Sequence, residues 1–140
     1  SGDTSAGGLA RLGWLLVEHP DLVIVELGAN DGLRGLEPSV TMANLEEIVK
    51  HIKEIGAKVL LTGMKAPPNM GPKYTEEFDQ IFEVVAHKHN VELFPFFLEN
   101  VATIPHLNQS DGIHPNEEGV KMIVDGIFPF VMTLLAVKSE

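Results

Sequence analysis

Apolar residues at helical spacing alternate along the chain with short β-branched runs. The first helical pattern follows Asp3 or Thr4, either of which can cap a helix, and it ends near Pro20. Residues 22–27, Leu-Val-Ile-Val-Glu-Leu, predict a strand buried on both faces, and residues 28–32 predict a loop at its carboxyl end. The first helix repeats its apolar residues along two rows: Leu9, Leu12 and Leu16, and Ala10, Trp14 and Val17.

Three further helices and two further strands follow. Helices are predicted over 41–55, with Thr41 or Asn44 as its cap and Gly56 as its stop, near 75–89, and after Pro115 with Asn116 as its cap. Strands are predicted at 58–62 and 91–94. The helix residues expected in the core are Leu45, Ile48, Val49, Ile52 and Ile55, then Phe78, Ile81, Phe82 and Val85, and finally Val120, Ile123, Val124 and Ile127.

Alternating helices and strands predict an α/β fold with a parallel sheet covered on both faces. Such a sheet binds ligands outside the carboxyl ends of its strands, which residues 28–32 and 111–116 can both reach. The order begins on a helix, whereas this architecture normally begins on a strand.

Length and composition favour one domain, residues 1–140, around a single core, because 44% of 140 residues are hydrophobic. The formal charge of −10 repels phosphate backbones and anionic membranes, so no nucleic-acid partner is expected. The apolar runs are too short or too mixed to predict stable membrane insertion. Without cysteine the chain has neither a disulfide nor a thiolate nucleophile.

The candidate chemistry starts with Asp111 and His114, which stand three residues apart just before a predicted helix. A carboxylate so placed can accept from one imidazole nitrogen while the other faces a cleft, which gives a general base and its orienter. Alternatively, Asp111 only caps a turn and His114 only precedes a proline. The motif alone does not separate these two interpretations.

Two upstream residues could stabilise a developing negative charge. Asn30 follows a buried strand, where its amide can donate to an oxyanion, although an Asn in a positive-φ turn has the same surroundings. Gly2 precedes a helix start, where its backbone N–H can point outward beside the positive end of the helix dipole. The alternative for Gly2 is an ordinary flexible terminal glycine.

In chain order, Ser-Gly-Asp-Thr at 1–4, Gly-Ala-Asn-Asp at 28–31 and Asp-Gly-Ile-His-Pro-Asn at 111–116 resemble blocks two, three and five of the SGNH (GDSL-type) hydrolases. The stretches 1–12, 25–36 and 93–97 look like the branch that contains thioesterase I, lysophospholipase L1 and arylesterase.

This resemblance implies a flavodoxin-like three-layer α/β/α sandwich and hydrolysis of small acyl esters or thioesters, including lysophospholipids and aryl esters, through an acyl-serine intermediate. It implies no metal or cofactor. It assigns the Gly2 N–H and the Asn30 side chain as oxyanion-hole donors, His114 as general base and Asp111 as its orienter. Periplasmic or secreted members are frequent in the family, so such a location is expected.

Block one of the family, a strand followed by Gly-Asp-Ser-Leu with the nucleophilic serine, has no counterpart here. Thr4 and Ser5 imitate it, but no strand precedes them and Thr4 occupies the serine's place. Ser1 acting through its own amine is a chemical alternative. We therefore expect the nucleophile to be absent from this chain and to lie in an N-terminal strand–helix–strand of roughly 35 residues. The chain alone should be inactive.

In flavodoxin-like order the absent first strand lies beside the strand at 22–27, whose apolar edge would stay unpaired. We expect either a separately supplied N-terminal segment or a second copy of the chain to cover it. A non-catalytic binding module derived from the same family is the alternative function. The other aromatic and histidine residues are interpreted as structural, with no metal site expected: Trp14, Met64, Phe94, Phe96 and Phe97 as core or pocket wall, and His19, His51, His87, His89 and His106 without ligand-like companions.

Overall fold

The computed structural model describes residues 2–136 and contains one parallel sheet. Its strands are β1 (Leu22–Val25), β2 (Lys58–Thr62) and β3 (Glu92–Phe94), in the order β1-β2-β3. Val23 pairs with Val59, and Leu61 pairs with Leu93. Because helices connect successive parallel strands, the predicted α/β class is confirmed.

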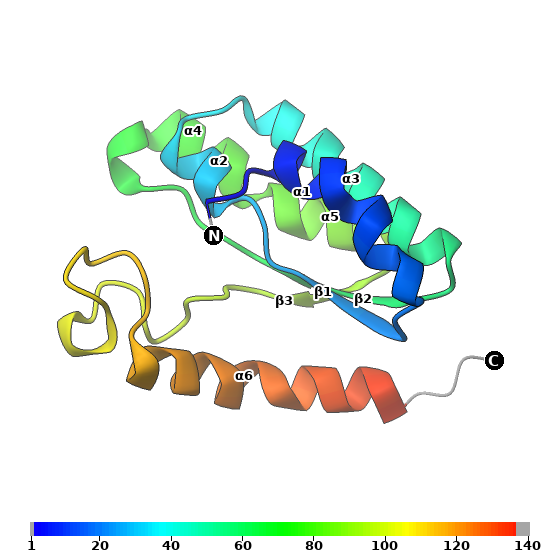
Figure 1. Cartoon of the computed structure of the whole chain (residues 1–140). Coiled ribbons are helices and arrows are strands. Elements are labelled where there is room, and N and C mark those ends of the chain that lie inside the picture. The colour runs from blue at the N-terminus through cyan, green and yellow to red at the C-terminus, as the bar shows by residue number, and fades with distance from the viewer. Residues whose placement is uncertain (1, 137–140) are drawn as a thin grey trace. The chain divides into compact units, whose positions relative to one another are not determined.

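Residues up to Pro95 form one compact unit, and residues from Phe96 onward form a second. In the first unit α1, α3 and α5 lie on the same side of the sheet (Figure 1). This unit contains the helices α1 (Ser5–Leu15), α2 (Ala29–Leu33), α3 (Pro38–Glu54), α4 (Pro72–Asp79) and α5 (Ile81–His89), with 3-10 turns at Leu16–Glu18 and Pro68–Met70.

The core of the first unit lies between α3, α5 and the central strand. The predicted inward residues of α3 and α5 are buried apart from Ile55, and residues 59–62 of β2 are also buried. Ile55, expected on the same face, instead ends α3 as its cap, and Gly56 follows with the positive φ of 81° that stops the helix. The fully or almost fully buried residues are Leu45, Ile48, Val49, Ile52, Leu60, Leu61, Phe78, Ile81, Phe82 and Val85.

Several helix boundaries differ from the prediction. Thr4 caps α1 as expected, since its Oγ1 accepts from the Gly7 N–H at 3.2 Å. The predicted caps Thr41 and Asn44 lie inside α3, which begins earlier because Pro38 fits the first helical position. The helix predicted near 75–89 is two helices, α4 and α5, separated at Gln80. Residues 28–32, predicted as a loop, lie mostly in α2.

Two predicted burials in the first unit are wrong. Ile24 of β1, an edge strand of the described sheet, is 44% exposed. Trp14 is 87% exposed, and Val17 is also exposed. The buried row of α1 repeats at near-four-residue spacing through Gly8 and Leu12, so Trp14 and Val17 lie to one side of it.

The second unit consists of irregular coil, a 3-10 turn at Pro105–Leu107 and α6 (Glu117–Ala136). Ile123 of α6 packs with Val101 and Leu107 in a small apolar cluster. The predicted cap Asn116 is confirmed, because its Oδ1 accepts from the Gly119 N–H at 3.0 Å.

The buried residues of α6 form a narrow row, Gly119, Ile123 and Ile127, at four-residue spacing. Val120 and Val124, predicted to be buried, lie one position off that row and are exposed. By length and composition alone α6 could cross a membrane, a criterion that core helices of soluble proteins also meet.

Candidate active site

Asp111 and His114 form a directly bonded pair in the second unit. The imidazole Nδ1 lies 2.7 Å from Asp111 Oδ2. Asp111 Oδ1 accepts from the backbone N–H groups of Ile113 at 2.9 Å and His114 at 3.0 Å. Gly112 completes the turn at a φ of 69°, which favours glycine. One carboxylate therefore both closes the turn and holds the imidazole ring.

The electrostatics of the pair fix which imidazole nitrogen is free. The hydrogen bond from the His114 ring, followed by those from the His114 and Ile113 backbone N–H groups, lowers the pKa of Asp111 from 3.8 to about 2. An ionised carboxylate only accepts hydrogen bonds, so Nδ1 carries the proton and Nε2 of the neutral ring keeps its lone pair. The His114 side chain is 60% exposed, so this lone pair is available to a reacting group.

Asn108, which the sequence did not place in the site, holds the backbone that precedes the pair. Asn108 is buried and donates from Nδ2 to the Val101 carbonyl at 2.8 Å and the Ile104 carbonyl at 2.9 Å. The next residue, Gln109, donates its backbone N–H to the His114 carbonyl at 2.8 Å. Asn108 lies in a coil segment with no periodic pattern around it, so the sequence carried no distinctive signal for it.

Gly2 and Asn30, the two predicted oxyanion donors, line one pocket of about 120 Å³ in the first unit. Asn30 lies in the first turn of α2 and donates from Nδ2 to the Asp3 carbonyl at 3.0 Å. An amide nitrogen carries two hydrogens, so one remains for a ligand. Gly2 has a φ of 81°, and its carbonyl accepts from Arg34 at 3.3 Å. The start of the described chain thus lies against α2 (Figure 1).

A buried carboxylate next to Asn30 was not predicted. Asp31 is 1% exposed and accepts from the Ser5 N–H at 2.7 Å, the Ser5 hydroxyl at 2.5 Å and the Thr41 hydroxyl at 2.9 Å. A signal for it was present in the sequence. Thr41 stands four residues before Leu45 on the apolar face of its helix, so its hydroxyl needed a buried partner.

The hydroxyls considered as nucleophiles within this chain are engaged in other roles. Ser5 is fully buried, donates to Asp31 and accepts from Asn44 Nδ2 at 3.0 Å. Thr4 Oγ1 caps α1. These contacts argue against attack on an ester by either hydroxyl, and Ser1 lies outside the described residues.

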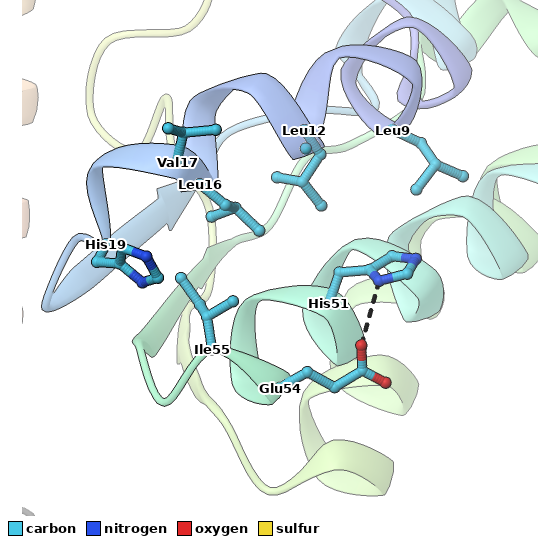
Figure 2. Close-up of a pocket in the computed structure, with 9 residues that line it drawn as sticks. Leu9, Leu12, Leu16, Val17, His19, His51, Glu54 and Ile55 are labelled. Carbon is cyan, nitrogen blue, oxygen red and sulfur yellow. Dashed lines mark ion pairs between the residues drawn. The ribbon is translucent and has the colours of Figure 1, made fainter.

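A larger pocket of about 360 Å³ lies between α1 and the end of α3, as Figure 2 shows. Leu12 and Leu16 form part of its apolar wall, and His51 bonds Glu54 at 3.3 Å on its rim. None of the predicted site residues lines it. Among residues 2–136, no group of three or more His, Asp or Glu side chains could hold a metal ion.

Known proteins match this chain over almost its whole length. Esterase TesA of Pseudomonas aeruginosa is 46% identical over 136 residues, which cover 96% of this chain and 68% of that protein. Thioesterase 1/protease 1/lysophospholipase L1 of Escherichia coli K12 is 46% identical over 126 residues, 89% of this chain and 61% of that protein. The chain thus spans about two thirds of the length of these relatives.

The crystal structure of the psychrotrophic esterase EstA from Pseudoalteromonas sp., inhibited by monoethylphosphonate, superposes with a TM-score of 0.91 at 36% identity. The match covers 98% of this chain and 75% of EstA, and it confirms the predicted α/β fold of an SGNH hydrolase. The GDSL-like Lipase/Acylhydrolase family matches residues 1–122. With 122 of 140 residues matched and relatives at 46% identity, this chain belongs to the GDSL-like lipase/acylhydrolase family.

Proposed function

We propose that this chain is the part of an ester and thioester hydrolase that carries the general base and the oxyanion donors. The observation that carries the proposal is the Asp111–His114 pair, in which Nδ1 is held at 2.7 Å and the ring stays exposed. The names of the relatives, an esterase and a thioesterase/lysophospholipase, support acyl esters and thioesters as the substrate class.

In the proposed reaction a serine oxygen attacks the carbonyl carbon of the ester while His114 Nε2 accepts the serine proton. The carbonyl electrons move onto oxygen, and the Gly2 N–H and Asn30 Nδ2 stabilise that negative charge. Collapse restores the carbonyl, breaks the C–O or C–S bond, and returns the proton from His114 to the leaving group. Water then repeats the sequence and releases the acid, while Asp111 stays ionised throughout.

The nucleophilic serine is proposed to belong to a segment N-terminal to Ser1. Two observations support this. Within the chain, Thr4 caps α1 and the Ser5 hydroxyl bonds Asp31, so neither hydroxyl is free to attack. The relatives are also longer than this chain. A joined protein tests the proposal, in which the region of Pseudomonas aeruginosa Esterase TesA that precedes its match is placed before residue 1.

The assay compares this chain and the joined protein on p-nitrophenyl butyrate and with a serine-directed phosphonate. We expect the chain alone to show neither turnover nor labelling, and the joined protein to show both, with the label on a serine of the added segment. Substitution His114→Ala in the joined protein should abolish turnover, whereas the control His87→Ala, on α5, should not. Labelling of a residue within this chain would contradict the proposal.

A joined protein that folds and binds esters without turnover would support the non-catalytic binding module instead. The periplasmic or secreted location stays a prediction, which fractionation of the native host's cells would test.

A further inference from the structure

The carboxylate of Asp31 has no part in the proposed chemical steps, yet it accepts three hydrogen bonds in the interior of the first unit. Its Oδ1 accepts from the Ser5 N–H at 2.7 Å, and its Oδ2 accepts from the Ser5 hydroxyl at 2.5 Å and the Thr41 hydroxyl at 2.9 Å. Asp31 is 1% exposed, and Ser5 and Thr41 are fully buried. Hydrogen bonds to a carboxylate that is buried away from water are stronger than those between neutral, exposed groups.

These bonds connect three helices at the pocket that holds the candidate oxyanion donors. Ser5 is the first residue of α1, Asp31 lies in α2, and Thr41 lies in α3. Gly2 precedes Ser5 by three residues, and Asn30 precedes Asp31 by one. The Asn30 amide adds a further bond between α2 and the residues before α1, because it donates to the Asp3 carbonyl at 3.0 Å.

We propose that Asp31 is a positioning residue that fixes the spacing between the Gly2 N–H and the Asn30 amide. The inference rests on the proposed function of these two groups as oxyanion donors. Asp31 itself is too deeply buried to touch a substrate. It acts by holding the start of α1 and the first turn of α2 in one geometry.

Positioning of this kind should appear in kcat and not in KM. The oxyanion forms only in the transition state, so a displaced donor weakens transition-state binding and leaves ground-state binding nearly unchanged. Displacements of about 1 Å at a reacting centre can cost roughly 100-fold in rate. Loss of folded protein would also lower the apparent kcat at constant KM, so kcat is calculated per folded protein, with the folded fraction measured by circular dichroism.

Kinetics in the joined protein test the proposal through Asp31→Asn, which keeps the shape and removes the charge. We expect kcat to fall about 10- to 100-fold with KM within about twofold. Ser5→Ala, which retains the backbone bond to Oδ1, should cost only a few-fold and serves where Asp31→Asn does not fold. The matched control is Asp79→Asn, because Asp79 also accepts a backbone N–H, that of Ala66 at 2.8 Å, away from the pocket. Its kcat should not change.

A double substitution tests whether Asp31 acts through the donors. Asn30→Ala removes one donor outright, so adding Asp31→Asn should cost much less in this background than in the parent protein. Equal costs in both backgrounds, or a control that loses as much kcat as Asp31→Asn, would overturn the proposal.

Nuclear magnetic resonance of this chain alone separates a failure of the positioning role from a failure of the proposed function. Asp31→Asn should shift the Gly2 backbone amide and the Asn30 side-chain amide signals, while the amides of β2 stay in place. Unshifted Gly2 and Asn30 signals would refute positioning whatever the activity. Shifted signals together with an inactive joined protein would refute the proposed function and leave the structural role of Asp31 intact.

Discussion

At the scale of single residues, the ionisation of Asp111 is the best-defined electrostatic property of the site. Its pKa is lowered to about 2 from 3.8 by the His114 ring and two backbone N–H groups. An acid whose pKa is lower in the folded than in the unfolded chain stabilises the fold at pH values above the unfolded pKa. The turn at 111–114 therefore keeps this contribution above about pH 4 and loses it as the pH falls toward 2.

Carbon-13 titration of the Asp111 carboxyl in this chain checks the value directly. We expect a midpoint near 2 in the parent chain. In His114→Ala the midpoint should rise, because the largest cause is removed, but it should stay below 3.8 because the Ile113 and residue-114 backbone donors remain. A midpoint unchanged by His114→Ala would show that the ring does not interact with the carboxylate in solution.

Activity should require that residue 111 accepts a hydrogen bond from His114 Nδ1, so a side chain that donates to Nδ1 instead should not support it. In Asp111→Asn an amide N–H can face Nδ1, which favours the tautomer with its proton on Nε2 and removes the lone pair that accepts the serine proton. We expect kcat of the joined protein to fall by roughly 100- to 10,000-fold. A loss under about fivefold, measured by the rate of p-nitrophenolate release, would contradict this role.

The sequence predicts the residues that chemistry singles out and misses those that support them. Asp111 and His114 form a recognisable pattern by their spacing, and the structure joins them at 2.7 Å. Asp31 carries no such pattern, because its partners Ser5 and Thr41 lie 26 and 10 residues away and meet only when the helices pack. The apolar surroundings of Thr41 indicate that its hydroxyl needs a buried partner, but which residue supplies that partner depends on tertiary contacts that no local spacing encodes.

At the scale of elements, two helical glycines have opposite surroundings. A Cβ at Gly119, in the first turn of α6, would lie 2.2 Å from the Leu107 carbonyl oxygen. A Cβ at Gly13, in α1, would meet no atom within 4 Å. Glycine at 119 therefore permits close packing between the helix and the preceding turn, whereas glycine at 13 only lowers helix propensity.

We expect Gly13→Ala to raise the free energy of unfolding by about 0.5–1 kcal/mol through helix propensity. Gly119→Ala should lower it by about 1–3 kcal/mol, because the helix must move away from Leu107. Urea unfolding of the two variants, followed by circular dichroism, measures both signs. Stabilisation by Gly119→Ala would mean that the close approach to Leu107 is absent in solution.

The helices and strands were predicted from periodicity, and the errors have two physical causes. Helix α3, and the helix predicted near 75–89 that the structure divides into α4 and α5, were predicted with their buried faces because their apolar rows are long and regular. The five-residue helix α2 is too short to show a period, so it was predicted as a loop. Trp14 and Val124 were predicted to be inside because periodicity shows which side chains are apolar but not how many neighbours are present to cover them.

At the scale of the whole molecule, the outer edge of β1 is the feature that links fold to function. The Asp21 carbonyl accepts from the Lys58 N–H and the Val25 carbonyl from the Thr62 hydroxyl, so these residues face β2. Backbone groups alternate along a strand, so those of Leu22 and Ile24 face the other edge. Within residues 2–136 no strand pairs there. A parallel strand N-terminal to Ser1 would both cover this edge and lead to the proposed serine.

Hydrogen exchange distinguishes the possible partners of this edge. In this chain alone at low concentration, the Leu22 and Ile24 amides should exchange rapidly, whereas the Leu60 amide of the central strand should be protected. In the joined protein we expect Leu22 and Ile24 to slow by roughly 100-fold or more, with Leu60 protected as before.

Each alternative leaves a separate signature in the same experiment. Protection of Leu22 and Ile24 that grows with the concentration of this chain would identify a second copy as the partner, because pairing between copies follows mass action. Protection at every concentration without the added segment would show that the edge is already covered, and the strand that brings the serine would then have to enter elsewhere. If the joined protein is active while its Leu22 and Ile24 amides still exchange rapidly, catalysis does not require pairing at this edge, and the proposed link between the two is wrong.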